Sequence, residues 1–198
     1  MTVRIVEEPS SKLAEYARIS IAFDVQEELS VVADDDGLGG LRLIARAVAA
    51  PYVKDYDSEP SHHPTTWGGR FDGSGWTVLT ALRDGARLGG AVVVRDSPGV
   101  EILEGRRDLA VLWDLRVAPA ARGSGIGAAL FRAVEQWARR RAARWLKAET
   151  QNINVGACRF YARQGCTLGA IHRFAYPTLP DEVQLFWYKQ LGVGDDSD

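Results

Sequence analysis

The stretch WDLRVAPAARGSGIG, residues 113–127, decides the fold, because it joins an apolar strand to a glycine-rich loop and to the start of a helix. Glycines carry no side chain, so several backbone N–H groups can close on an anion. The helix that starts there adds unpaired N–H donors and the positive end of its dipole. Arg122 adds a full positive charge. Residues 122–127 therefore predict a binding loop for a pyrophosphate.

Two common phosphate-binding patterns do not fit this loop. No Gly-Lys-Ser/Thr follows the glycines, as a Walker loop requires. The dinucleotide fingerprint opens a parallel βαβ unit near its start, whereas this loop follows several strands. A glycine loop alone is also compatible with a plain tight turn, so its flanks must decide its role.

The segment before the loop predicts an antiparallel meander. Residues 76–82 alternate apolar and polar side chains, and Asp84-Gly85 is a typical hairpin turn. Residues 88–95 then form the returning strand. Leu109–Val117 is a third strand, and it runs directly into the loop.

The segment after the loop changes from a period of two to the period of a helix. The apolar positions that share one helix face are Ile126, Leu130, Ala133, Val134 and Trp137. This helix is expected to end near Ala143. A shorter helix is expected from Asn154, a capping residue, to Gln164, with Gly165 closing it. Further strands are predicted at residues 145–150, 167–174 and 184–188.

The N-terminal part gives weaker signals. Residues 2–6 alternate as a strand does, and residues 22–32 are compatible with a helix or a strand. Residues 41–50 favour a strand, although their alanines also suit a helix. Residues 51–75 are irregular and rich in Pro, Asp, Ser and aromatic side chains, which is typical of a binding loop. We predict one α/β (α+β) domain over residues 1–191 and a frayed polar tail over residues 192–198.

Composition excludes several classes of protein. The net charge of −2 over 198 residues does not predict a nucleic-acid-binding surface. The apolar runs are far shorter than the ~20 residues of a membrane-spanning helix, and no secretory signal is visible. Two cysteines fit a reducing compartment, so we expect a cytoplasmic protein. His62-His63 has no further ligand at metal-binding spacing, so no metal is expected.

Two spaced motifs resemble those of the GCN5-related N-acetyltransferases (GNAT). The first is Leu-x-Val-x-Pro followed by Arg-x-x-Gly-x-Gly, from Leu115 to Gly127. The second places Asn154, Ala157, Tyr161 and Gly165 at the family's spacing, with Cys166 where a Phe is usual. Within the family, the segments ETQNIN, RFYARQGCTLGAI and DEVQLFWY are most similar to streptothricin acetyltransferases, which acetylate an amino group of a cationic antibiotic.

The resemblance, which covers residues 79–188, implies a fold and an activity. The fold is a mixed, mostly antiparallel central sheet of about six to seven strands, splayed at the cofactor strand and flanked by about four helices. The activity is transfer of acetyl from acetyl-CoA, the co-substrate, to a primary amine of a small cationic acceptor in a ternary complex. Acetylation of a protein lysine or N-terminus, or acyl-CoA sensing without turnover, remains an alternative. A homodimer is also compatible with the resemblance.

The resemblance also assigns the cofactor-binding residues. Backbone groups of the cofactor strand bind the pantetheine arm and the acetyl carbonyl, the loop holds the pyrophosphate, and the second motif lies along the pantetheine and the sulfur. The residues implied are Leu115, Arg116, Val117, Arg122, Gly123, Ser124, Gly125, Ile126, Gly127, Ala128, Asn154, Ala157 and Tyr161.

Three side chains are candidates for proton transfer. Tyr161 is predicted to protonate the leaving thiolate, since a phenol with a pKa of ~10 stays protonated at neutral pH. Asp114 and Glu149 are candidate bases for the acceptor amine. Structural roles remain open for all three: Tyr161 as a core residue, Asp114 as a paired acid, and Glu149 as a turn cap or a partner of Arg159. The direction of Asp114 depends on whether the strand contains a bulge.

Overall fold

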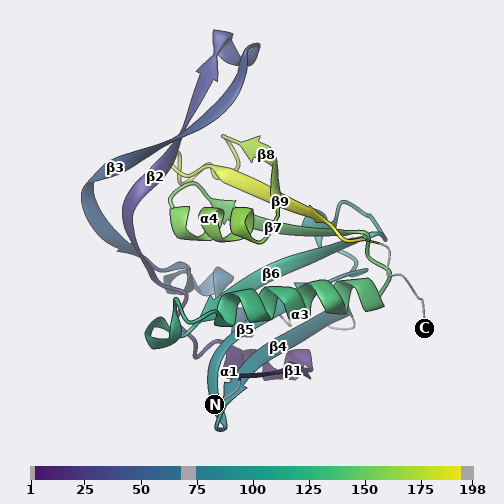
Figure 1. Ribbon diagram of the computed structural model, residues 1–198. Helices are drawn as coiled ribbons and strands as arrows, with labels where there is room; N and C mark the ends of the chain where they lie inside the picture. The colour runs from purple at the N-terminus through teal and green to yellow at the C-terminus, as the bar shows by residue number, and fades with distance from the viewer. Residues whose placement is uncertain (1–2, 68–74, 193–198) are drawn as a thin grey trace. The chain divides into compact units, whose positions relative to one another are not determined.

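The computed structural model describes residues 3–67 and 75–192 (Figure 1). The described chain packs as two compact units. The first unit comprises residues 3–21, 55–67, 75–148 and 189–192, and the second unit comprises residues 22–54 and 149–188. The predicted tail, residues 192–198, lies outside the described residues beyond Gly192. The expectation of one domain over residues 1–191 stays a prediction.

The first unit contains most of a seven-stranded main sheet, in the order β1-β4-β5-β6-β7. β6 and β7 are parallel, and the other neighbours are antiparallel. The strands are β1 (Arg4–Glu8), β4 (Trp76–Arg83), β5 (Ala86–Val94), β6 (Leu109–Val117) and β7 (Trp145–Gln151). The β4–β5 hairpin turns at Asp84 and Gly85, whose φ angles of 52° and 79° are those of the predicted hairpin turn.

Two helices cover opposite faces of this sheet. Consecutive residues of a strand face opposite sides. A Cβ at Gly89 would lie 3.2 Å from Leu130 of α3 (Ile126–Arg140), whereas a Cβ at Gly90 would lie 2.8 Å from the ring of Tyr16 in α1 (Leu13–Tyr16). Gly90 is therefore required by the close approach of Tyr16. Figure 1 shows α3 lying along the strands of this unit.

The core under α1 is rich in tryptophan. Its buried members are Leu13, Tyr16, Trp67, Trp76, Val78, Val92, Val94, Val100, Leu103, Leu109 and Val111. Short 3-10 turns fill the connections of the chain: η1 (Ser10–Lys12), η2 (Asp35–Gly37), η3 (Tyr56–Ser58), η4 (Pro60–His62), η5 (Pro64–Thr66), η7 (Glu101–Leu103) and η8 (Pro119–Ala121).

The second unit combines a long ribbon with the last elements of the chain. β2 (Phe23–Asp34) and β3 (Gly40–Lys54) pair as an antiparallel ribbon. β8 (Thr167–His172) and β9 (Gln184–Gln190) pair antiparallel, and α4 (Val155–Arg163) precedes them. The buried residue Asn152 connects these parts, because its backbone accepts from Leu29 at 3.0 Å and its amide oxygen accepts from Val183 at 2.7 Å.

The predicted fold class is confirmed by this mixed, mostly antiparallel arrangement. The described residues contain three α-helices where about four were expected. The ambiguous residues 22–32 lie in β2, and residues 41–50 lie in β3, so both are strand. The periodicity of residues 22–32 is ambiguous because most side chains of β2 are half-buried, so neither face of the strand is uniformly apolar.

Candidate active site

A bulge in β6 sets the direction of Asp114. Val92 of β5 pairs with Asp114, and Val93 pairs with Leu112, so Trp113 is the extra residue. The Trp113 ring packs edge-on against Trp76, with ring centroids 5.2 Å apart. Because the bulge inserts one residue, Asp114 follows Trp113 onto the core face. The strand thus contains the bulge on which the direction of Asp114 depends.

The same strand has a free edge after the bulge. β6 pairs with β7 only from Leu109 to Leu112. From Asp114 to Val117, β6 pairs with β5 alone among the described residues. The backbone N–H and C=O groups on the other edge of this segment are thus without a strand partner, which agrees with the splayed cofactor strand that was predicted around Leu115.

Asp114 and Arg116 belong to a buried ion cluster. Arg116 donates through Nε to Asp114 Oδ2 at 2.6 Å, and it binds both carboxylate oxygens of Asp57, at 2.5 and 2.9 Å. Its side chain is 1% exposed, and its guanidinium also lies 5.3 Å from the centre of the Tyr16 ring. Buried charges need such pairing. The Arg116 side chain therefore connects Asp57 to β6. Only the backbone of Arg116 remains for contact with a cofactor.

The cluster also changes the ionisation of its members. Burial raises the pKa of Asp114, although the Arg116 guanidinium opposes this rise. Burial likewise raises the pKa of Tyr16, and the charge of Asp114 adds to that effect. The carboxylate of Asp114 is thus already ion-paired with the guanidinium of Arg116.

The glycine loop is open and internally braced. Gly123 and Gly125 have φ angles of 76° and 85°, which favour glycine, and no atom lies within 4 Å of a Cβ built on either. Arg122 donates to Val117 O at 3.1 Å and to Ser20 O at 3.2 Å. Ser124 donates to the Ala121 carbonyl at 2.6 Å. These bonds shape the loop while its glycines stay exposed.

The start of α3 fits an anion. Gly125 is the N-cap residue and supplies no side-chain hydrogen bond to the helix. The first N–H groups of the helix, at Ile126, Gly127 and Ala128, therefore have no side-chain cap. An exposed, uncapped helix start with adjoining glycines has the donor set that a pyrophosphate requires.

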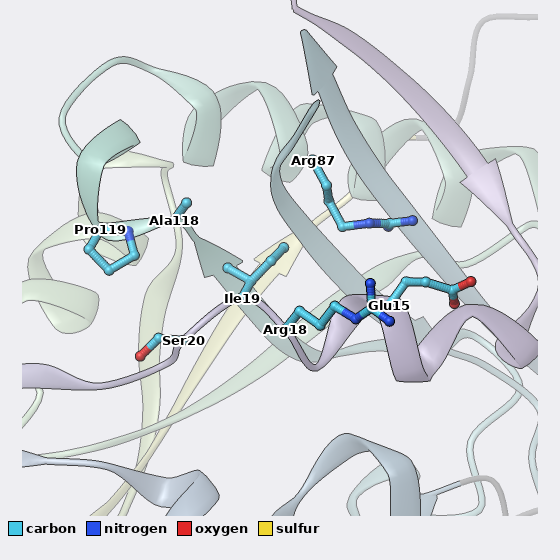
Figure 2. A pocket seen from close by; sticks show the side chains of 7 residues that line it. All are labelled: Glu15, Arg18, Ile19, Ser20, Arg87, Ala118 and Pro119. Carbon is cyan, nitrogen blue, oxygen red and sulfur yellow. The ribbon is translucent and has the colours of Figure 1, made fainter. Parts of the chain in front are cut away.

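A pocket of about 350 Å³ borders the beginning of this loop (Figure 2). It is lined by Glu15, Arg18, Ile19, Ser20, Arg87, Ala118 and Pro119. Arg87 is paired with Glu8 at 2.8 Å, and Glu15 with Lys12 at 2.9 Å. The pocket contains none of the predicted cofactor residues.

In the second unit, Asn154 starts α4 as predicted. Its side-chain oxygen accepts from the N–H of Ala157 at 3.0 Å. Tyr161, two turns later, is 6% exposed, and its ring packs edge-on against Phe160 with centroids 5.3 Å apart. Gly165, with φ of 79°, closes the helix. The sequence motif thus coincides with one capped helix.

Glu149 lies in a hydrogen-bonded group that the sequence did not reveal. The hydroxyl of Tyr176 donates to Glu149 Oε1 at 2.5 Å. Gln151 Nε2 lies 3.2 Å from the same oxygen and 2.8 Å from the Tyr176 hydroxyl. The alternative partner, Arg159, is paired with Glu27 instead. Tyr176 is 27 residues from Glu149 and belongs to no motif, so only the fold shows this contact.

Cys158 is buried, and its sulfur lies 3.4 Å from the Thr150 hydroxyl. Burial raises the pKa of its thiol. No group of three or more His, Cys, Asp or Glu side chains in the described part of the chain is arranged to hold a metal ion. Among the helices of residues 3–67 and 75–192, none has the length and apolar character needed to cross a membrane.

Comparisons with known proteins agree with the motifs. The model of the acetyltransferase (GNAT) family matches residues 41–166. A streptothricin acetyltransferase of Escherichia coli is 30% identical over 179 residues, which is 88% of this chain and 89% of that protein. Streptothricin acetyltransferase A of Bacillus subtilis (strain 168) is 37% identical over 81 residues, 40% of this chain and 47% of that protein.

A solved structure shows the same fold. The crystal structure of a nourseothricin acetyltransferase aligns with a TM-score of 0.75 and 23% identity, over 96% of this chain and 99% of that chain. The resemblance stated from the two motifs is thus confirmed. The chain belongs to the GNAT family of acetyltransferases, and it is an N-acetyltransferase that uses acetyl-CoA as its co-substrate.

Proposed function

We propose that this enzyme acetylates a primary amine of a small, cationic, streptothricin-like antibiotic. The observation that carries the proposal is the similarity to the Escherichia coli streptothricin acetyltransferase over 88% of this chain, which extends beyond the cofactor motifs. Similarity over nearly the whole length is more informative about the acceptor than a shared cofactor loop.

The glycine loop and the cofactor strand hold the co-substrate. The N–H groups at Ile126, Gly127 and Ala128, with Arg122 to Gly125, bind the pyrophosphate. Backbone groups of Leu115 and Val117 bind the pantetheine arm and the acetyl oxygen, where N–H donors stabilise the negative charge that develops during attack. When bound, acetyl-CoA supplies the thioester that the amine attacks.

We assign the base to Glu149 and not to Asp114. The Asp114 side chain is 8% exposed and lies 2.6 Å from Arg116, so its negative charge is already paired with a guanidinium. Glu149 is half-buried, and its hydrogen-bond partners among the described residues are the neutral groups of Tyr176 and Gln151. A carboxylate without a cationic partner can bind the acceptor ammonium and take its proton, directly or through water.

Tyr161 then donates the proton to the leaving thiolate, and the transfer is direct. A cysteine intermediate is disfavoured because Cys158 is buried and its thiol has a raised pKa. A thiol of that kind is a poor nucleophile at neutral pH. Asn154 and Ala157 contribute to the pantetheine side of the site.

The test is a panel of acceptors. The purified enzyme is incubated with acetyl-CoA and with streptothricin, aminoglycosides, polyamines or lysine peptides, and the release of free thiol is followed. Streptothricin should give the highest kcat/KM, and mass spectrometry should find one acetyl group on an amine. Faster turnover of a lysine peptide would replace the antibiotic by a protein acceptor. Binding of acetyl-CoA with no thiol release from any acceptor would indicate a sensor.

A further inference from the structure

The hydrogen-bonded group around Glu149 consists of three side chains from two segments of the chain. Glu149 and Gln151 are two residues apart on β7, so they project from the same face of the strand. Tyr176 comes from the connection between β8 and β9. A turn in that connection is fixed by the hydrogen bond from Leu179 N to Tyr176 O, at 3.0 Å. The β8–β9 connection thus holds the Tyr176 hydroxyl against Glu149 of β7.

The two oxygens of Glu149 differ in their surroundings. Tyr176 and Gln151 both approach Oε1, at 2.5 and 3.2 Å. No hydrogen bond from a residue within 3–67 or 75–192 reaches Oε2. A carboxylate has about four acceptor positions. Fixing Oε1 from two directions orients the carboxylate plane and leaves Oε2 to accept from a cation.

The phenol keeps its proton in this position. Burial, and after it the charge of Glu149, raises the pKa of Tyr176 well above its ordinary value. Tyr176 therefore stays a donor throughout the pH range in which a carboxylate base works.

We propose that Tyr176 is a positioning residue, which together with Gln151 holds Glu149 through Oε1 so that Oε2 receives the ammonium of the acceptor. The proposal rests on the proposed role of Glu149 as the base. It assigns to the β8–β9 connection a function in acceptor chemistry, although that connection carries no recognisable motif.

The test begins with Tyr176→Phe, which keeps the ring and removes the donor. We expect kcat/KM for streptothricin to fall about 10-fold, with an unchanged Kd for acetyl-CoA. Tyr52→Phe is the matched control. Tyr52 is a 44% exposed phenol of the same unit, and it lies in β3, not in the irregular loop that was predicted to begin at residue 51. Its removal should leave kcat/KM unchanged.

A double-mutant cycle with Glu149→Gln separates positioning from general damage. If Tyr176 acts through Glu149, Tyr176→Phe should change kcat/KM less than 2-fold in the Glu149→Gln background. A full 10-fold loss in that background would overturn the proposal. Melting temperatures of all variants show whether they are folded. A wild-type enzyme that does not acetylate streptothricin would refute the proposed function instead.

Discussion

The helices α3 and α4 both start at a family motif, yet their first turns differ. α3 starts at Gly125, which has a left-handed backbone, stands exposed and offers no capping side chain. α4 starts at Asn154, whose side chain accepts from the N–H of Ala157 at 3.0 Å. The first N–H groups of α3 have no side-chain cap, whereas the start of α4 satisfies one donor internally.

The two helix starts of this chain therefore differ in what their first N–H groups can do. The uncapped N–H groups at the start of α3, together with the helix dipole, can bind the pyrophosphate. The capped start of α4 instead fixes where the helix begins, and so where Tyr161 lies along it. Substitutions at the two starts should therefore affect different properties.

Gly125→Glu should have the largest effect, a loss of acetyl-CoA binding of more than about 100-fold. The substitution puts a Cβ on a left-handed residue and a negative charge beside the N–H groups that bind the phosphates. Isothermal titration with acetyl-CoA measures it. The matched control is Gly99→Glu, because Gly99 has a φ of 79°, is exposed and lies in the turn after β5.

Gly99→Glu carries the same backbone strain and charge, so it should bind acetyl-CoA as the wild type does. Equal losses in both variants would mean that the charge or the strain acts on the protein in general. Binding of acetyl-CoA that survives in Gly125→Glu would show that the loop does not hold the pyrophosphate.

The parts of the site that sequence predicted are local. The loop at residues 122–127, the strand Leu109–Val117 and the cap at Asn154 each depend on a few consecutive side chains, and all are found where expected. The seven-stranded, mostly antiparallel sheet followed from the same local signals and the family resemblance.

The parts that sequence missed depend on contacts between distant segments. The direction of Asp114 follows from a bulge at Trp113, which is accommodated by packing against Trp76 and leaves no trace in periodicity. The pairing of Arg116 with Asp57 spans 59 residues. Tyr176 is 27 residues from Glu149, and no sequence motif near either residue predicts their contact.

The ribbon β2–β3 was also hard to predict, for a different reason. Its strands are mostly half-buried or exposed, so neither face imposes a strict alternation. Leu38, near its turn, is 90% exposed, and Val53 is 65% exposed. Without a buried face, the pattern of residues 22–32 does not distinguish a strand from a helix.

Tyr161→Phe should have the next largest effect, and it tests what the capped helix positions. Loss of a general acid typically lowers turnover by about 100-fold or more. We expect kcat to fall on that scale, with the Kd for acetyl-CoA unchanged. Single-turnover assays with streptothricin measure the chemical step. Unchanged turnover would assign Tyr161 to the core, where its ring already packs against Phe160.

Two substitutions at Asn154 should have the smallest effects, and together they separate its cap from its predicted contact with pantetheine. Asn154→Ala removes the acceptor for the Ala157 N–H and should cost about 1 kcal/mol of stability in urea unfolding. Asn154→Asp keeps an equally good cap, so its stability should match the wild type, but it removes the amide donor. If that amide reaches the pantetheine, Asn154→Asp should weaken acetyl-CoA binding by a few-fold, about the net value of one hydrogen bond. Wild-type affinity in Asn154→Asp would make Asn154 a cap alone, and the contrast between the two helix starts would then be complete: the start of α3 would serve the ligand, and the start of α4 only the fold.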